Sequence, residues 1–206
     1  HAIETGVSPL EFPDAFSENF SNDPASLRLK QIVYVAYFGS QTNIDALEWF
    51  LKDVHPLICH AVPDYKLVVV GRGDLSKFGK YRGLQVELVG EVPSIAPYIK
   101  TAKLGIAPAL GGAGFRGKVN QYAVLGIPAV VSSIALQGLA YRDGESVFVA
   151  DESWEFAERC VRLLTDDDLN DRIAHEARKL CVEKYVWESK WAQIRDAYSL
   201  EECVSC

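Results

Sequence analysis

The chain has 206 residues, of which 49% are hydrophobic and 24% are charged. This composition is typical of globular proteins, and the length suits one large α/β domain or two small ones. No stretch comes near the roughly 18 consecutive apolar residues of a transmembrane helix, so we expect no transmembrane segment. The net charge of −7 argues against a role in coating nucleic acid, because binding to a polyanion requires a basic face.

The first residue and the cysteines indicate whether the chain is complete and in which compartment we expect it. The sequence begins with His1 and contains no Met, so we interpret it as part of a longer protein. The five cysteines are irregularly spaced, and three in apolar stretches are expected to be buried thiols: Cys59, Cys160 and Cys181. An odd cysteine count of this kind favours a reducing compartment. We therefore expect a cytoplasmic protein, or one that is peripheral to a membrane in its full length.

Short apolar runs alternate with helical patterns after a loop-like segment at residues 1–29. Six runs are predicted strands, at 32–38, 66–71, 86–90, 104–108, 127–132 and 146–150. Helices are predicted from Asn43 or Asp45 through Val54, at 95–102, at 118–125, from Ser153 onward and at 188–200.

This alternation predicts the fold class. Strands separated by helices are typical of βαβ units, and nearly continuous apolar strands belong to sheets covered on both faces. We expect an α/β fold with a doubly wound, mostly parallel, six-stranded Rossmann-like sheet flanked by helices. In such sheets, ligands bind at the carboxyl ends of the strands, so the loops that follow the strands should carry the site.

The loop after the fourth predicted strand combines glycines with two cations. Gly111, Gly112 and Gly114 allow the backbone to approach a ligand closely, and the loop opens into a helix whose N-terminus attracts anions. Arg116 and Lys118 add positive charge at the same place, which suits a diphosphate. The alternative is a flexible turn with two solvated basic residues. The spacing matches neither a P-loop nor a first-strand dinucleotide motif.

Longer motifs in this region resemble a known family. The segment 112–133 reads GAGFRGKVNQYAVLGIPAVVSS, and the segments 67–73 and 90–92 read LVVVGRG and GEV. These segments, in this order, resemble the C-terminal domain of group 1 glycosyltransferases, which are glycogen-synthase-like, retaining enzymes of GT-B architecture. Residues 4–7, ETGV, resemble the linker that joins the two GT-B domains.

The resemblance implies a domain organisation. Residues 1–29 would form an interdomain linker, residues 30–186 a Rossmann-like domain that binds a nucleotide sugar, and residues 187–206 a C-terminal helix and tail. The acceptor-binding N-terminal domain would be missing from this chain and would be its partner.

The resemblance also implies roles for individual residues. Gly112, Gly114 and Phe115 would present backbone groups to the diphosphate, and Arg116 and Lys118 would neutralise it during catalysis. The base would lie against the loop after the third strand, near Val92. Arg72, after the second strand, would face the phosphates or be a solvated turn residue.

Two positions depart from the family pattern. The family holds the sugar and the ribose of the donor with two Glu residues eight positions apart, and Ala113 and Gln121 occupy those positions here. Gln121 can still hydrogen-bond to ribose hydroxyls, whereas Ala113 has no polar side chain.

Other candidate motifs have plainer interpretations. We interpret Asn43 as a helix cap rather than a ligand, and the acidic run 166–168 as a turn and cap rather than a metal site. His55, Cys59 and His60 lack a fourth ligand, and the Cys pair at 203 and 206 lies in a tail. We therefore expect no metal ion.

The resemblance thus implies that the chain is the donor-binding domain of a hexosyltransferase. The substrate would be a nucleotide sugar, with UDP or GDP, and no cofactor would be needed. The sugar would pass to a glycan or a lipid-linked acceptor, as in polysaccharide biosynthesis. The alternatives are a non-catalytic GT-B-like module of a larger protein and a nucleotide-sugar epimerase.

Overall fold

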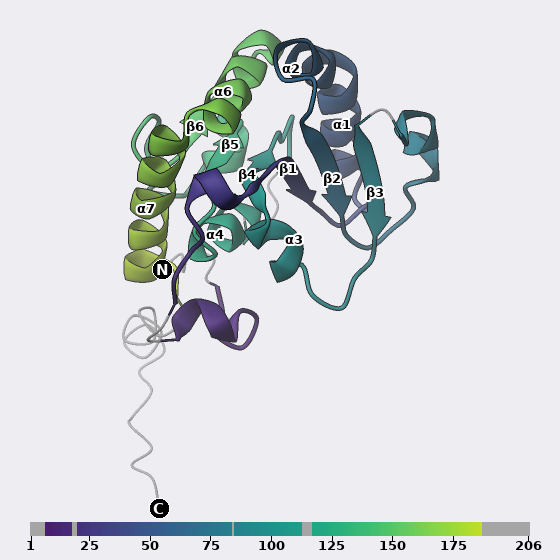
Figure 1. Ribbon diagram of the computed structural model, residues 1–206. Coiled ribbons are helices and arrows are strands. Elements are labelled where there is room, and N and C mark those ends of the chain that lie inside the picture. Colours follow the sequence, from purple (N-terminus) through teal and green to yellow (C-terminus); the bar gives the residue numbers. More distant parts are fainter. Residues whose placement is uncertain (1–6, 18–19, 84, 113–116, 187–206) are drawn as a thin grey trace, which may run out of the picture.

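A six-stranded parallel sheet forms the centre of the molecule (Figure 1). The computed structural model describes residues 7–17, 20–83, 85–112 and 117–186, so the helix expected at 188–200 lies outside the described residues. The strands are β1 Leu29–Val35, β2 Lys66–Val70, β3 Val86–Gly90, β4 Ala102–Ala107, β5 Ala129–Val131 and β6 Phe148–Val149. Their order, β3-β2-β1-β4-β5-β6, confirms the doubly wound sheet.

Helices connect these strands and follow the last one. They are α1 Gln41–Trp49, α2 His55–Ala61, α3 Ala96–Lys100, α4 Gly117–Val124, α5 Ser133–Leu136, α6 Ser153–Thr165 and α7 Asp167–Lys184. Three short 3-10 helices are η1 Pro13–Phe16, η2 Ala25–Leu27 and η4 Ser76–Tyr81, and η3 Phe50–Val54 is a π-helical turn.

Alternation along β1 divides the core into two layers. Ile32 and Tyr34 point to one face of the sheet, whereas Val33 and Val35 point to the other, and all four are buried. Both faces of a parallel sheet must be covered, which explains why the strand reads as a continuous apolar run.

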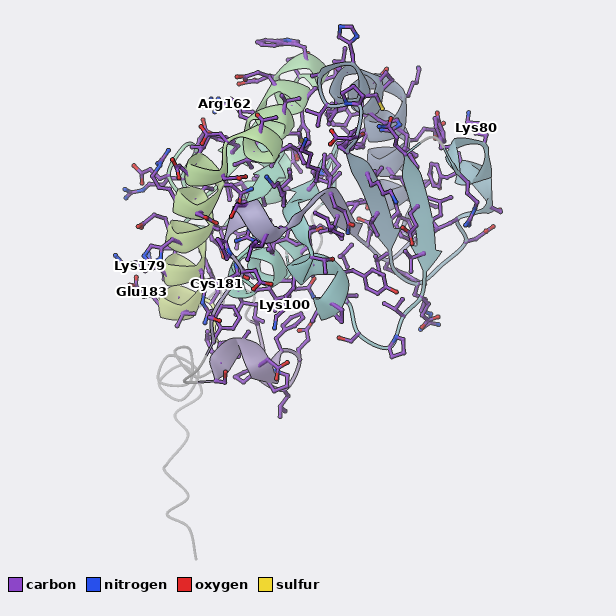
Figure 2. The ribbon with its side chains drawn as sticks, viewed as in Figure 1. Lys80, Lys100, Arg162, Lys179, Cys181 and Glu183 are labelled. Atoms are coloured by element: carbon purple, nitrogen blue, oxygen red, sulfur yellow. The ribbon has the colours of Figure 1, made fainter. Side chains whose placement is uncertain are left out.

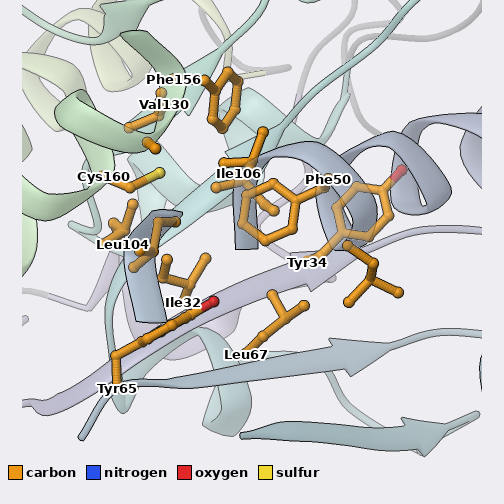
Figure 3. Packing of buried hydrophobic residues seen from close by; sticks show 14 of the residues in the cluster. Ile32, Tyr34, Phe50, Tyr65, Leu67, Leu104, Ile106, Val130, Phe156 and Cys160 are labelled. Carbon is orange, nitrogen blue, oxygen red and sulfur yellow. The ribbon is translucent and has the colours of Figure 1, made fainter. Parts of the chain in front are cut away.

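Helices α1, α2 and α6 cover the first face. Phe50 and Phe156 pack edge to face there, with their ring centroids 6.0 Å apart, and Cys160 belongs to the same cluster (Figure 3). Both aromatic rings and Cys160 are fully buried. This layer therefore confirms Cys160 as a buried thiol.

The second face is covered by α3, α4, the C-terminal part of α7 and the segment before β1. Cys181 lies inside this layer, whereas Lys80, Arg162 and Lys179 project outward from the ribbon (Figure 2). Cys181 is completely buried, and Cys59 is partly exposed.

Several boundaries differ from those predicted, and two of the differences are large. The first strand occupies Leu29–Val35 rather than 32–38, because its first residues are exposed and hydropathy does not mark them. The helix predicted to end at Val54 instead continues through η3 into α2. Pro56 lies in the first turn of α2, where it has no N–H to donate, and the wider π-turn accommodates it.

A buried amide joins α7 to the amino ends of the central strands. The side-chain nitrogen of Asn170 donates hydrogen bonds of 2.8 Å to the carbonyl oxygens of Lys103 and Leu163. Its oxygen accepts one of 3.0 Å from Arg28. The preceding Asp166 caps α7 through the N–H of Leu169, which confirms that the acidic run forms a turn and cap.

Tyr122 of α4 binds the two central strands together. Its hydroxyl donates to the carbonyl oxygen of Ile106 in β4 and accepts from the N–H of Val35 in β1, both at 3.1 Å. The ring lies directly over Gly105, where an added Cβ would come within 2.5 Å of it.

We predict that Gly105→Ala lowers the free energy of unfolding by about 1–3 kcal/mol, because the buried ring of Tyr122 has no room to move. Chemical denaturation monitored by circular dichroism would measure this. Gly79→Ala is the matched control, since no atom lies within 4 Å of a Cβ there. Equal stability of the two variants would contradict the prediction.

Candidate functional site

The loops that follow β1 and β2 cross closely at the carboxyl edge of the sheet. A Cβ on Gly71 would lie 1.8 Å from the carbonyl oxygen of Ala36, and one on Gly73 would lie 2.6 Å from the carbonyl carbon of Phe38. Both glycines also have positive φ angles, of 143° and 126°. Only glycine fits these two positions, and Arg72 is held between them with an exposed side chain.

A serine joins the next pair of loops at the same edge. The Ser132 hydroxyl, which follows β5, donates to the carbonyl oxygen of Ala109 at 2.7 Å. The same oxygen atom accepts from the N–H of Ala135 at 3.2 Å and thereby caps α5. The glycine-containing loop after β4 is thus anchored at its start.

Lys118 lies in the first turn of α4, where the sheet edge and the helix meet. Its ammonium group donates to the Asn43 side-chain oxygen at 3.0 Å and lies 5.0 Å from the centre of the Tyr34 ring. Burial removes water from the charged form and lowers the pKa of Lys118 to about 8. Among the described residues, no carboxylate forms an ion pair with it.

Two cavities meet at this lysine. One of about 80 Å³ extends toward the loop after β4, and one of about 450 Å³ lies between the loop after β1 and the amino-terminal parts of α1 and α4. Thr42, Asn43 and Lys118 line both. The amine therefore stands between two spaces that a ligand could occupy together.

Gly112 lines the smaller cavity. Its φ of +98° is in the region that favours glycine, and a Cβ there would lie 3.3 Å from the Thr42 methyl group. The predicted neighbours Gly114, Phe115 and Arg116 lie outside the described residues, as does Ala113.

The remaining predicted residues surround the site at different distances. Gln121 lines the larger cavity, and its side-chain nitrogen donates to the Glu11 carboxylate at 2.7 Å. Val92 is half-buried against the second core layer. Neither Val92 nor Arg72 lines either cavity.

The prediction that Asn43 caps the helix is wrong. Ser40 occupies the N-cap position of α1, and Asn43 lies in the first helical turn. There its side-chain nitrogen donates to the carbonyl oxygen of Tyr37 at 2.9 Å, which turns its oxygen toward Lys118. The sequence also does not indicate Tyr34 and Glu11 as residues of the site, because neither belongs to a polar motif.

The other motifs show no site in the described part of the chain. His55 is buried, and its Nδ1 is hydrogen-bonded to the Tyr65 hydroxyl. No three His, Cys, Asp or Glu side chains gather as a metal site would require within the described ranges. Cys203 and Cys206 lie outside those ranges. Among the described helices, none is long and apolar enough to cross a membrane.

Comparison of the sequence with known proteins identifies relatives. The profile of the family described as glycosyl transferases group 1 matches residues 30–166. The phosphatidyl-myo-inositol mannosyltransferase of Mycobacterium leprae is 29% identical over 155 residues, which is 72% of this chain and 41% of that protein. The chain therefore spans less than half the length of this relative.

Solved structures share the fold at low sequence identity. The C-terminal domain of the group 1 glycosyl transferase LpcC from Francisella tularensis has a TM-score of 0.65 at 16% identity, over 78% of this chain and 89% of that one. HepE from Anabaena, solved in complex with UDP and glucose, has a TM-score of 0.64 at 16% identity, over 86% of this chain and 50% of that one. The chain thus belongs to the group 1 glycosyl transferases, as the C-terminal, Rossmann-like domain of their GT-B architecture.

Proposed function

We propose that this domain binds a nucleoside diphosphate sugar and, in the longer protein, donates the sugar to an acceptor hydroxyl. The observation that carries the proposal is Lys118, a cation that is largely buried at a cavity and has no carboxylate partner among the described residues. Desolvating such a cation costs free energy, which an anion bound beside it would offset. The N-terminus of α4 adds the positive end of its dipole at the same place.

The choice of a nucleotide sugar as ligand is supported by the family and by one neighbour. HepE was solved with UDP and glucose, and the Mycobacterium leprae relative is named a mannosyltransferase. We therefore propose a UDP- or GDP-sugar as donor substrate, with a glycan or lipid-linked acceptor, as in polysaccharide biosynthesis. Residues 30–186 would bind the donor, with 1–29 as linker and 187–206 as a C-terminal helix and tail. The three cysteines in the described ranges are free thiols, which supports a cytoplasmic location.

The proposed chemistry places the positive charge of the site at the leaving group. As the acceptor oxygen bonds to the anomeric carbon, the bond to the diphosphate breaks and negative charge develops on the departing oxygen. Lys118, held by Asn43 and Tyr34, would stabilise that charge, together with Arg116. The backbone of Gly112, Gly114 and Phe115 would contact the phosphates, and Arg72 and Val92 would face the nucleotide.

A second candidate is a non-catalytic module of the same fold. It is favoured by Ala113 and Gln121, which replace two carboxylates that the family uses to hold the donor. Such a module would keep the fold and lose the affinity for nucleotide.

We predict that UDP or GDP stabilises the chain and that the Arg116→Ala/Lys118→Ala variant loses this effect. A ligand at about 100 times its Kd adds roughly 2.7 kcal/mol, which raises the Tm by about 5–10 °C. Differential scanning fluorimetry with UDP, GDP, ADP and CMP would measure the shift. Lys179→Ala, at an exposed position of α7, is the control and should respond like the unmodified chain. No shift with any nucleotide at millimolar concentration would favour the non-catalytic module.

The lowered pKa of Lys118 predicts that nucleotide binding takes up a proton. A bound diphosphate raises this pKa above its free value of about 8, so the complex holds more protons than the free protein at and above that pH. Affinity should therefore fall as the pH rises from about 7 to 9. Isothermal titration calorimetry in buffers of different ionisation enthalpy would measure the uptake. Lys118→Met should abolish it, and uptake that persists in this variant would refute the assignment.

A further inference from the structure

We propose that Glu11, held in place by Gln121, binds the vicinal hydroxyls of the ribose of the nucleotide. The residue comes from the segment before β1, far in sequence from the glycine-containing loop. The inference rests on the proposed function and adds to it the residue that distinguishes a ribonucleotide from its deoxy form.

The backbone around Glu11 is anchored on both sides. Upstream, the N–H of Val7 donates to the carbonyl oxygen of Tyr185 at 2.6 Å, and Val7 is buried. Downstream, the side chain of Phe12 is only 3% exposed and packs in the second core layer, followed by the buried Ala15. The N–H of Glu11 itself donates to the carbonyl oxygen of Ser8 at 3.0 Å. The backbone of Glu11 is therefore fixed in the fold, and its exposed side chain extends from that point.

The contact with Gln121 leaves acceptor capacity on the carboxylate. The amide nitrogen of Gln121 donates to Glu11 Oε1 at 2.7 Å, across a sequence separation of 110 residues. No described residue donates a hydrogen bond to Oε2. An ionised carboxylate accepts hydrogen bonds and cannot donate them, and two neighbouring hydroxyls supply two donors. The side-chain oxygen of Gln121 is a further acceptor beside them.

The distance along α4 suits a nucleoside diphosphate. Lys118 and Gln121 are three residues apart, so they lie on the same face of the helix with about 5–6 Å between their Cβ atoms. Both line the larger cavity. A diphosphate at Lys118 would bring the ribose, which is the adjoining chemical unit, to Gln121 and Glu11.

The two charges also fix the direction of the ligand. A phosphate placed against the Glu11 carboxylate would be repelled, whereas one at Lys118 would be attracted. The neutral hydroxyls are the part of the nucleotide that can donate hydrogen bonds to a carboxylate. Lys118 in the cavity and Glu11, which reaches its edge through Gln121, would therefore recognise different parts of one molecule.

The test compares ribonucleotides with deoxyribonucleotides. Isothermal titration calorimetry on the chain would measure Kd for UDP and 2′-deoxy-UDP, and for GDP and 2′-deoxy-GDP. We expect the better-binding ribonucleotide to bind about tenfold more tightly than its 2′-deoxy form, because a hydrogen bond to a charged group is lost. In Glu11→Gln this ratio should fall to about one, while 2′-deoxynucleotide affinity stays within about threefold of the unmodified chain.

Two further variants test whether the change in the ratio is specific to Glu11. Glu87→Gln, at an exposed position of the edge strand β3, should keep the tenfold ratio. The reversed pair, Glu11→Gln/Gln121→Glu, should regain most of the ratio, because an amide and a carboxylate again lie side by side in the same place. A purely structural role for Glu11 would change both nucleotides equally and leave the ratio unaltered.

The outcomes separate this inference from the proposed function. Tight ribonucleotide binding with an unchanged ratio in Glu11→Gln would overturn the role of Glu11 and leave the donor site standing. A reversed pair with a ratio of about one would also count against it. Absence of nucleotide binding in the unmodified chain would overturn both proposals together.

Discussion

The hydroxyl of Tyr122 is the interaction on which the geometry of this domain depends. Regular pairing of β1 with β4 stops at Val33 and Gly105, and beyond that point the two strands separate. The Tyr122 hydroxyl bridges Val35 of β1 and Ile106 of β4 across the opening. Chain order reverses between these two strands, which is where a crevice forms at the carboxyl edge of a doubly wound sheet. The bridge thus ties the two strands together across the crevice and fastens α4 beside it.

The position of Lys118 follows from that attachment. It precedes Tyr122 by one helical turn, so the residue that fastens the helix also sets the direction of the amine. Tyr34 and Asn43 approach the amine from β1 and α1, and neither carries a negative charge. The surroundings orient the cation without neutralising it. Burying a charge without an opposite charge beside it lowers the stability of the fold, but keeps that charge available for an anionic ligand.

The sequence predicted what depends on local pattern. Apolar runs located all six strands, because strands covered on both faces must be apolar, and the glycine-containing loop indicated the edge that carries the site. The missed features depend on contacts between distant segments. Asn is a residue type that is common at helix caps. The contact between the side-chain oxygen of Asn43 and Lys118, 75 residues later, becomes visible only in the folded structure. The pairing of Glu11 with Gln121 has no sequence pattern at all.

The bridge between Val7 and Val186 has a consequence for engineering. The polypeptide enters and leaves the described domain at one spot, so the unit to transplant is 7–186 rather than the family match 30–166. Cutting at residue 30 would remove Phe12 and Ala15 from the core and expose apolar surface of the second core layer. Conversely, the adjacent ends favour circular permutation, with a short linker joining them and new termini placed in an exposed loop.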